Sequence, residues 1–347
     1  MTINESKKPK MSVLFSNDTF IKPFHTFFNK YFEVSWSPIP YTPPPIGVMG
    51  YLSFPYRLIT KKLKTLRAIR KADIIFIEFA DETLALVSKW KKEKMLVTRL
   101  HRYELFNLPK ARWDSVDSII VVNNWMGEKV GQKLPQIIKK ITCIPNFLDL
   151  DYWKRSEKKT KTNQISIAGN IIPRKGHDKA IVAFSELLKE KKDLFLNIIG
   201  RPNDITFFQN LKLLVKELGI DERVRFKGFS DDLRKDFQMS DIILSFSEHE
   251  STHLTLFEGL SCGAWPLSIN WDGVDEFLPK ENIFSDNSEF VDKVKSFYSN
   301  DINQIIVKVD HLAKSTLVKF TEPDPRQQMS ELIIQTYEKH LEKINSK

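Results

Sequence analysis

The sequence predicts an α/β protein with two domains, each built on its own parallel sheet. The chain has 347 residues, which is more than one hydrophobic core usually serves, and 41% of them are hydrophobic. Short β-branched or aromatic runs alternate with longer segments of helical period. Strands that alternate with helical segments form parallel sheets joined by crossover helices. We therefore expect two α/β domains, each with a core of its own.

Short apolar runs supply the strand candidates in both halves of the chain. In order they are Met11–Ser16, Phe32–Trp36, Asp73–Phe79, Lys94–Leu100, Ser118–Asn123, Lys140–Pro145, Gln164–Gly169, Leu194–Gly200, Arg223–Lys227, Asp241–Ser247 and Trp265–Ile269. Gly169 and Gly200 each close a strand and precede a helical segment, so they mark the C-terminal edge of the second sheet. Ligands of open α/β sheets bind along that edge. The strand order thus predicts where a pocket lies.

Composition predicts the domain boundaries. The expected parts are a disordered tail at 1–10, a first domain at 11–150, a linker at 151–162, a second domain at 163–322 and a C-terminal helix at 323–347. The linker is polar and rich in Lys, Arg, Ser and Thr. Pro323 and Pro325 interrupt the chain before the last helical segment, which we expect to pack back on the first domain.

Charge and the absence of long apolar runs limit the classes of partner. Lys and Arg outnumber Asp and Glu by 53 to 44, and the formal charge of +9 favours anionic partners. No run reaches the roughly 18 apolar residues of a membrane span, and the polar start has no apolar signal segment. With 2 cysteines, the chain fits a reducing compartment. We expect a cytoplasmic protein, either free or peripheral on the inner face of the membrane.

Residues 51–72 form a basic helical segment with two interpretations. The cations are Arg57, Lys61, Lys62, Lys64, Arg67, Arg70 and Lys71, and Ile59, Leu63, Leu66 and Ile69 recur at helical spacing. Such a helix suits an anionic membrane surface, where it would bring the protein to a lipid-linked acceptor. The alternative is a packed helix with a solvated basic face.

The stretch Asp241–Gly263 carries the most specific chemistry. It reads as a buried strand, then acidic and hydroxyl residues, then an apolar helical run. If the helix begins near Thr252, Glu250 lies in the strand-to-helix loop and Glu258 lies about two turns inside the helix. Two carboxylates so placed can bind opposite ends of an extended ligand.

The start of that helix suits a phosphate. The free backbone N–H groups around His253, Leu254 and Thr255 would point out of the helix, and such N-termini bind anions. Ribose hydroxyls can donate to one of the flanking carboxylates and sugar hydroxyls to the other. The stretch therefore predicts a site for a nucleoside diphosphate that carries a sugar.

The same stretch resembles the E-x7-E signature of the retaining GT-B glycosyltransferases of family 4. Upstream segments are similar in the same order: Ile165–Gly176 (ISIAGNIIPRKG), Leu196–Gly200 (LNIIG) and Val224–Gly228 (VRFKG). The first domain is similar more loosely, in Lys94–His101, Ser118–Asn123 and Ile144–Asp149. The resemblance implies two Rossmann-like domains that face each other across a cleft. It also implies transfer of a sugar from a nucleoside diphosphate sugar to an acceptor hydroxyl with retention, in the synthesis of a cell-surface glycan or glycolipid.

The resemblance also implies roles for individual residues. Glu258 would hold the ribose, Glu250 the hydroxyls of the transferred sugar, and Lys175 with Arg174 the diphosphate, while His101 would lie near the transferred sugar. The implied catalytic residues are thus His101, Glu250 and Lys175. The donor-binding candidates are Gly169, Asn170, Arg174, Lys175, Gly200, Arg201, Phe229, His253, Leu254, Thr255 and Glu258. Fixed cations and amide dipoles stabilise the charge that grows on a leaving diphosphate, so no metal or other cofactor is expected.

Three positions depart from the family's pattern. Asn170 replaces the usual basic residue after the first glycine, and His253 stands where many members have glycine. The segment Ser16–Phe20 lacks the glycine-rich loop that often follows the first strand. Part of the contact with phosphate is then expected from Arg174 or Arg201.

Other classes of protein fit parts of the sequence. His249–His253 spells H-E-S-T-H, which matches the H-E-x-x-H motif of zinc metallohydrolases, but that motif must lie within a helix. Asp149–Asp151 matches a metal-binding D-x-D, although its position at the linker favours a turn. A non-catalytic basic protein that binds membrane or nucleic acid is a further alternative, but it would not need two carboxylates around a helix start. We expect no nucleic acid partner.

Overall fold

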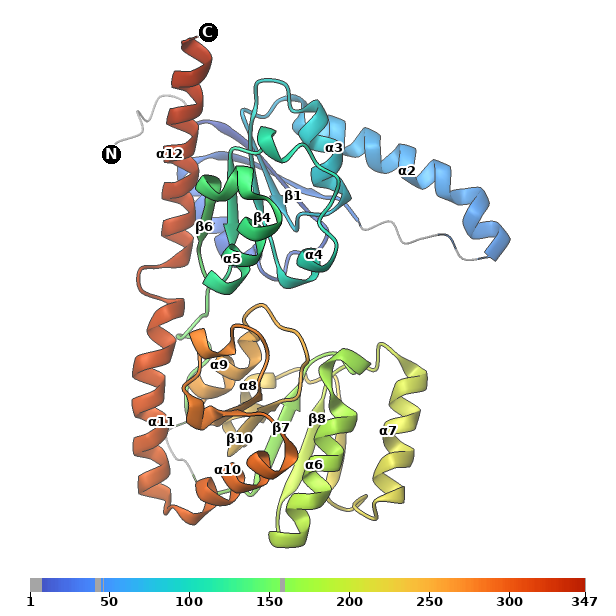
Figure 1. The fold of residues 1–347 in the computed structure, drawn as a ribbon, viewed down its shortest axis with the longest axis vertical. Coiled ribbons are helices and arrows are strands. Elements are labelled where there is room, and N and C mark those ends of the chain that lie inside the picture. Colours follow the sequence, from blue (N-terminus) through green and yellow to red (C-terminus); the bar gives the residue numbers. More distant parts are fainter. Residues whose placement is uncertain (1–7, 41–44, 46, 157–159, 347) are drawn as a thin grey trace. The chain divides into compact units, whose positions relative to one another are not determined.

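The computed structural model describes residues 8–40, 45, 47–156 and 160–346, and the chain divides into two compact units (Figure 1). Unit 1 comprises residues 1–147 and 323–347, and unit 2 comprises residues 148–322. Each unit has a parallel six-stranded sheet covered by helices, which confirms the predicted α/β class. Within the described ranges, no helix has the length and apolar character that a membrane span requires.

Unit 1 has the strand order β2-β1-β3-β4-β5-β6. Its strands are β1 (Lys10–Phe15), β2 (Glu33–Pro38), β3 (Ile74–Glu78), β4 (Met95–Arg99), β5 (Ser118–Val121) and β6 (Ile141–Cys143). Its helices are α1 (His25–Tyr31), α2 (Gly47–Arg70), α3 (Glu82–Trp90), α4 (Arg102–Phe106), α5 (Asn124–Lys133) and α12 (Pro325–Asn345). The central strands β3 and β4 are buried along their whole length, as strands covered on both faces are.

The C-terminal helix α12 belongs to unit 1. Asp324 caps its first turn by accepting from the backbone N–H of Arg326, and Pro325 occupies the first helical position. Met329 and Ile333 are fully buried in a hydrophobic cluster with residues of β1 and α1. The residues of α12 thus complete one of the two cores of this unit.

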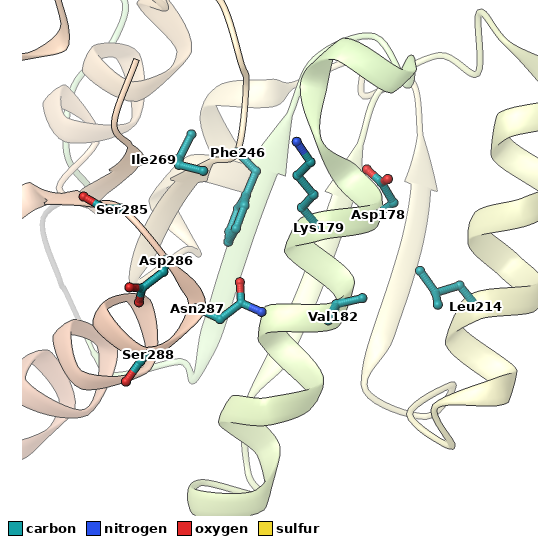
Figure 2. Close-up of a pocket in the computed structure, with 10 residues that line it drawn as sticks. All are labelled: Asp178, Lys179, Val182, Leu214, Phe246, Ile269, Ser285, Asp286, Asn287 and Ser288. Atoms are coloured by element: carbon teal, nitrogen blue, oxygen red, sulfur yellow. The ribbon is translucent and has the colours of Figure 1, made fainter. Parts of the chain in front are cut away.

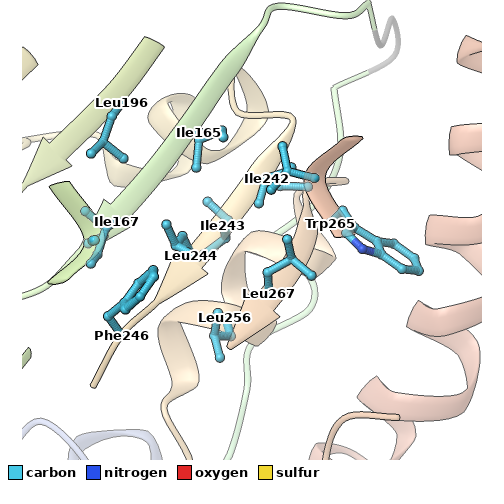
Figure 3. Packing of buried hydrophobic residues seen from close by; sticks show 14 of the residues in the cluster. Ile165, Ile167, Leu196, Ile242, Ile243, Leu244, Phe246, Leu256, Trp265 and Leu267 are labelled. Atoms are coloured by element: carbon cyan, nitrogen blue, oxygen red, sulfur yellow. The ribbon is translucent and has the colours of Figure 1, made fainter. Parts of the chain in front are cut away.

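Unit 2 has the strand order β12-β11-β10-β7-β8-β9. Its strands are β7 (Gln164–Ala168), β8 (Phe195–Ile199), β9 (Val224–Gly228), β10 (Ile242–Ser245), β11 (Trp265–Ile269) and β12 (Ile283–Phe284). Its helices are α6 (His177–Glu190), α7 (Ile205–Glu217), α8 (Leu233–Gln238), α9 (Leu254–Ser261), α10 (Asn287–Ser299) and α11 (Ile302–Leu317). Ile165, Leu196, Ile243 and Leu256 belong to its hydrophobic core (Figure 3). Strand β12 is absent from the sequence prediction because two residues are too few to show a period.

The boundary of unit 2 differs from the one that composition predicts. The division falls between Phe147 and Leu148, so the whole expected linker at 151–162 belongs to unit 2, together with residues 148–150 of the expected first domain. Trp153 packs against Phe237 with ring centroids 5.6 Å apart, and Arg155 pairs with Asp310. An aromatic anchor within a polar run therefore holds this segment on the domain. At the other end, β1 begins at Lys10, inside the expected tail, of which residues 1–7 lie outside the described residues.

Candidate functional site

The donor-binding candidates of unit 2 lie at the C-terminal ends of β7, β8 and β10. Gly169 follows β7, Gly200 follows β8, and Glu250 lies in the loop after β10. A Cβ atom at Gly200 would lie 1.8 Å from the carbonyl oxygen of Gly169, and Gly200 has a φ of +154°. The two loops therefore approach each other as closely as only glycine permits.

A partly buried ion pair lies at the centre of this edge. Lys175 Nζ lies 2.6 Å from Glu250 Oε1, and Arg174 Nη1 lies 3.3 Å from the same oxygen. The Ser247 hydroxyl donates to that oxygen as well, at 2.5 Å. Burial opposes ionisation of Glu250, but His253, the Lys175 ammonium and the Ser247 hydroxyl together lower its pKa to about 2. Glu250 is therefore a carboxylate at neutral pH, and Lys175 and Arg174 share one acceptor oxygen.

A tight turn places Lys175 against β10. The turn Pro173–Lys175 is a single 3-10 helix, and Gly176 follows it in the left-handed conformation with φ +65°. A Cβ atom at Gly176 would lie 2.3 Å from the carbonyl oxygen of Phe246. The R-K-G sequence thus needs its glycine so that the two basic residues reach the loop that carries Glu250.

Two helices at this edge begin without a side-chain cap. Helices α7, α10 and α11 start after Asp204, Asp286 and Asp301, whose carboxylates accept from first-turn N–H groups. Helices α6 and α9 start after Gly176 and His253, and neither residue caps its helix with a side chain. The first-turn amides of α9, which include Leu254 and Thr255, are therefore available to an anion together with the positive end of the helix dipole.

Glu258 lies on α9 about one turn after its first residue, Leu254, rather than about two turns as the sequence predicts. The difference arises because the loop extends to His253. Burial raises the pKa of the Glu258 carboxyl to about 7. In the part of the chain that the structure describes, no side chain forms a hydrogen bond or ion pair with it. A recessed carboxyl without a protein partner suits a ligand that brings hydroxyl donors.

His253 has a left-handed backbone, with φ 55° and ψ 60°. That conformation disfavours most side chains and explains why glycine is common at this position in the family that the sequence resembles. Burial lowers the pKa of its imidazole to about 3, so the ring is neutral at physiological pH. Neutral His253 adds no charge to the phosphate site.

The H-E-S-T-H segment does not form a zinc-peptidase helix. Residues 246–253 connect β10 to α9, and the helix begins only at Leu254. His249 and His253 therefore do not lie on one helical face, which the zinc motif requires. Within the described ranges, no three or more His, Cys, Asp or Glu side chains are grouped in a way that could hold a metal ion.

The remaining donor candidates lie at the rim. The Arg201 guanidinium stacks over the ring of Phe229, 4.2 Å from its centroid, and both residues are exposed. Asn170 is exposed in the loop after Gly169. A separate hollow of roughly 690 Å³ opens on unit 2, but it includes none of the donor candidates (Figure 2). It is lined by Asp178, Lys179, Val182, Leu214, Phe246, Ile269 and residues 285–288.

His101 belongs to a second cluster of charged residues, in unit 1. Its Nε2 lies 2.8 Å from Glu78 Oε1, and the same carboxylate accepts two bonds from Arg99 Nε, at 3.1 and 3.0 Å, and one from Nη2 at 2.7 Å. Glu78 ends β3 and Arg99 ends β4, and the parallel register places them opposite each other. All three side chains are buried. The register of two strands thus assembles the cluster.

The environment of His101 fixes its protonation. Burial alone would raise the pKa of Glu78, but Arg99 and His101 hold it below its ordinary value, so Glu78 stays ionised. Burial lowers the pKa of His101, which is therefore neutral. A neutral ring beside a carboxylate carries its proton on the nitrogen that faces it, here Nε2. Phe20 and Phe79 pack against the ring at centroid distances of 4.8 and 4.6 Å.

Sequence reasoning missed Glu78, Arg99 and Ser247. Glu78 and Arg99 are the charged residues of two otherwise apolar or neutral strands, IIFIE and MLVTR, and both stand at the last position. Opposite charges at equivalent ends of neighbouring parallel strands are a signal that a sequence search can use. Ser247 carries no such signal, because its role depends on the turn that returns Glu250 toward it.

Comparisons with known structures identify the fold of the chain. Sucrose-phosphate synthase from Thermosynechococcus elongatus aligns with a TM-score of 0.74 and 13% identity over 95% of this chain and 99% of that chain. Anabaena HepE, solved with UDP and glucose, aligns with a TM-score of 0.66 and 13% identity over 98% of this chain and 100% of its own. The fold is therefore GT-B, as the resemblance implied.

The family match lies in the second half of the chain. Residues 151–308, which lie within unit 2, match the family described as Glycosyl transferases group 1. N-acetyl-alpha-D-glucosaminyl L-malate synthase from Bacillus anthracis is 30% identical over 149 residues, which are 40% of this chain and 38% of the relative. The chain thus matches less than two fifths of that relative's length.

Proposed function

We propose that the protein transfers a sugar from a nucleoside diphosphate sugar to an acceptor hydroxyl. The observation that carries this proposal is the arrangement at the edge of the second sheet. There the Lys175–Glu250 pair lies among residues at the starts of two uncapped helices, and no side chain among the described residues pairs with the carboxyl of Glu258. The group 1 glycosyl transferase domain and the UDP-bound structure of HepE support the same class of donor.

Different residues bind different parts of the donor in this proposal. In the proposed complex Glu258 accepts hydrogen bonds from the ribose hydroxyls, and the amides of Leu254 and Thr255 face the diphosphate. Glu250 accepts from hydroxyls of the transferred sugar. Lys175 and Arg174 share that carboxylate, so a bound diphosphate has two cations beside it. UDP-sugars are the donors we expect, by analogy with HepE.

The reaction breaks the bond between the anomeric carbon and the diphosphate oxygen. The bond electrons stay on the leaving diphosphate, whose growing negative charge Lys175, Arg174 and the α9 amides stabilise. The acceptor oxygen forms the new glycosidic bond and loses its proton to the solvent or to the leaving group. We propose retention of configuration, and a lipid-linked or glycan acceptor. Because fixed cations supply the charge stabilisation, the proposed mechanism needs no metal ion.

A nucleotide screen tests the proposed function. A nucleoside diphosphate that binds only the folded protein should raise the melting temperature, by an amount that grows with its concentration over Kd. The matching sugar nucleotide should be consumed, either by transfer or by slow hydrolysis, and consumption should be unchanged in EDTA. If no nucleoside diphosphate stabilises the protein, the proposed function is wrong. If EDTA stops consumption and a divalent cation restores it, the metal-independent mechanism is wrong.

We place His101 among the residues that act on the transferred sugar rather than on the nucleotide. His101→Ala should lower the turnover number by roughly 10–100-fold. This loss is at or below the one expected when a residue that transfers a proton itself is removed. The affinity for the nucleoside diphosphate should change little. Glu78→Gln should lower turnover in the same direction, because it removes the carboxylate that fixes the tautomer of His101.

Tyr103→Ala is the matched control for this pair, since Tyr103 is a strongly exposed neighbour on α4. Its turnover and melting temperature should match those of the unmodified protein. Steady-state kinetics and calorimetry with the nucleoside diphosphate measure both quantities. Loss of nucleotide affinity in His101→Ala with intact turnover would contradict the assignment.

A further inference from the structure

Helix α2 presents a stripe of exposed apolar side chains on unit 1. The stripe consists of Met49, Leu52, Tyr56, Ile59, Leu63 and Leu66. Its members recur every three or four residues, so they share one side of the helix. Leu52 is 71% exposed and Tyr56 is 74% exposed. The stripe is therefore a helical face on which no described residue of unit 1 packs closely.

The opposite side of α2 is the one that contacts unit 1. Lys61, Thr65 and Ile69 are buried, and their spacing of four residues places them about half a turn away from the stripe. Lys61 also lies 3.2 Å from Glu82 at the start of α3. The N-terminal half of α2 extends beyond the rest of the unit (Figure 1). The interpretation of this segment as a packed helix with a solvated basic face is therefore only partly correct, because α2 also exposes an apolar face.

The charges around the stripe have one sign. No Asp or Glu occurs from Gly47 to Arg70. Lys64, Arg67 and Arg70 are exposed, and across the residues that the structure describes none of the three forms an ion pair. Arg67 and Arg70 also line a hollow of roughly 490 Å³ at the end of the stripe, together with Lys10, Glu33 and Lys71. The apolar stripe thus leads into a largely basic hollow.

Two kinds of occupant fit an apolar stripe of this spacing. A second copy of α2 would match the three-and-four repeat, as in a coiled coil. However, it would bring the same cations without acidic partners, and like charges along a helix pair are unfavourable. An anionic bilayer offers an apolar layer to the stripe and phosphates to the cations. Tyr56 suits the boundary between the two, since aromatic side chains with a polar tip favour that layer.

We propose that α2 lies along the surface of an anionic bilayer, with the stripe in the outer acyl layer and Lys64, Arg67 and Arg70 at the phosphates. The helix has 24 residues and is therefore about 36 Å long. The proposal rests on unit 1 alone and stands or falls independently of the donor site.

Vesicle flotation with the full chain tests this surface. The protein should bind phosphatidylcholine vesicles that contain phosphatidylglycerol, and should bind pure phosphatidylcholine much more weakly. Ile59→Glu/Leu63→Glu should weaken binding by at least about tenfold, since it places charge in the apolar stripe. The matched control is Ile205→Glu/Leu213→Glu on α7, where both side chains are also exposed. Its binding should be unchanged.

A second variant tests the charges. Arg67→Gln/Arg70→Gln should weaken binding to anionic vesicles by roughly thirtyfold, and added salt should reduce the difference. Sedimentation of each variant reports the oligomeric state, and melting curves report folding. The proposal is wrong if anionic vesicles do not bind the protein, or if neither variant weakens that binding. It is also wrong if the stripe variant only converts an oligomer to a monomer.

Discussion

Lys175→Met is expected to lower the turnover number by about 30- to 1000-fold, which corresponds to roughly 2–4 kcal/mol in the barrier. Lys175 is the cation closest to Glu250 and lies at the start of α6, at the edge of the sheet where the diphosphate is proposed to leave. Since negative charge on that group is greatest in the transition state, loss of the ammonium affects turnover more than donor binding. Binding should fall more for nucleoside diphosphate than for nucleoside, because only the former carries the charge that Lys175 meets.

The chain contains a matched control for this variant. Lys179 Nζ lies 2.6 Å from Glu248 Oε1, the same distance as in the Lys175–Glu250 pair, but its side chain is 50% exposed and that of Glu248 is 48% exposed. Exposed ion pairs contribute little, so Lys179→Met should leave turnover and nucleotide affinity unchanged. Kinetics with the sugar nucleotide and calorimetry with the nucleoside and its diphosphate separate the two variants. Full turnover in Lys175→Met would contradict the proposed donor site.

The second half of the fold is readable from the sequence because its signals are local. Gly169 and Gly200 each mark a sharp turn at a strand end, and Gly176 ends the R-K-G segment just before α6. The structure then brings Lys175 within 2.6 Å of Glu250, although the two are far apart in the chain. Parallel strands make this possible, since they gather their C-terminal loops at one edge.

Features that depend on register or on packing were not readable in this way. Glu78 and Arg99 meet because β3 and β4 pair in one register, and a slip of one residue would place them on opposite faces. Trp153 attaches a polar segment to unit 2 through its contact with Phe237. The face of α2 that packs could not be chosen from periodicity, because apolar residues lie on both its buried and its exposed sides. To predict each of these contacts, one must know which residue lies opposite in the folded protein.

Glu258→Gln is expected to remove a fall in stability between about pH 4.5 and pH 7. Burial raises the pKa of Glu258 from 4.5 to about 7 in the folded protein. As the pH rises through this interval the unfolded chain releases its proton first, so the free energy of unfolding decreases, by roughly 3 kcal/mol if the full shift is expressed. Buried His253 and His177 act in the opposite direction over an overlapping pH range, because folding lowers their pKa values from 6.5 to about 3 and about 4. The difference between the protein and its Gln variant isolates the contribution of Glu258.

The same titration should appear in ligand binding. Only the ionised carboxylate accepts both hydrogen bonds of a ribose diol, so the affinity for the nucleoside should rise about tenfold between pH 6 and pH 8, as the ionised fraction of a group with a pKa of about 7 does. The nucleoside is the correct probe, because a phosphate would titrate in the same range. Glu258→Gln should bind it more weakly at pH 8, by about 1–3 kcal/mol, and without this pH dependence. If stability and nucleoside affinity depend on pH in the same way in the unmodified protein and in Glu258→Gln, Glu258 does not hold the ribose.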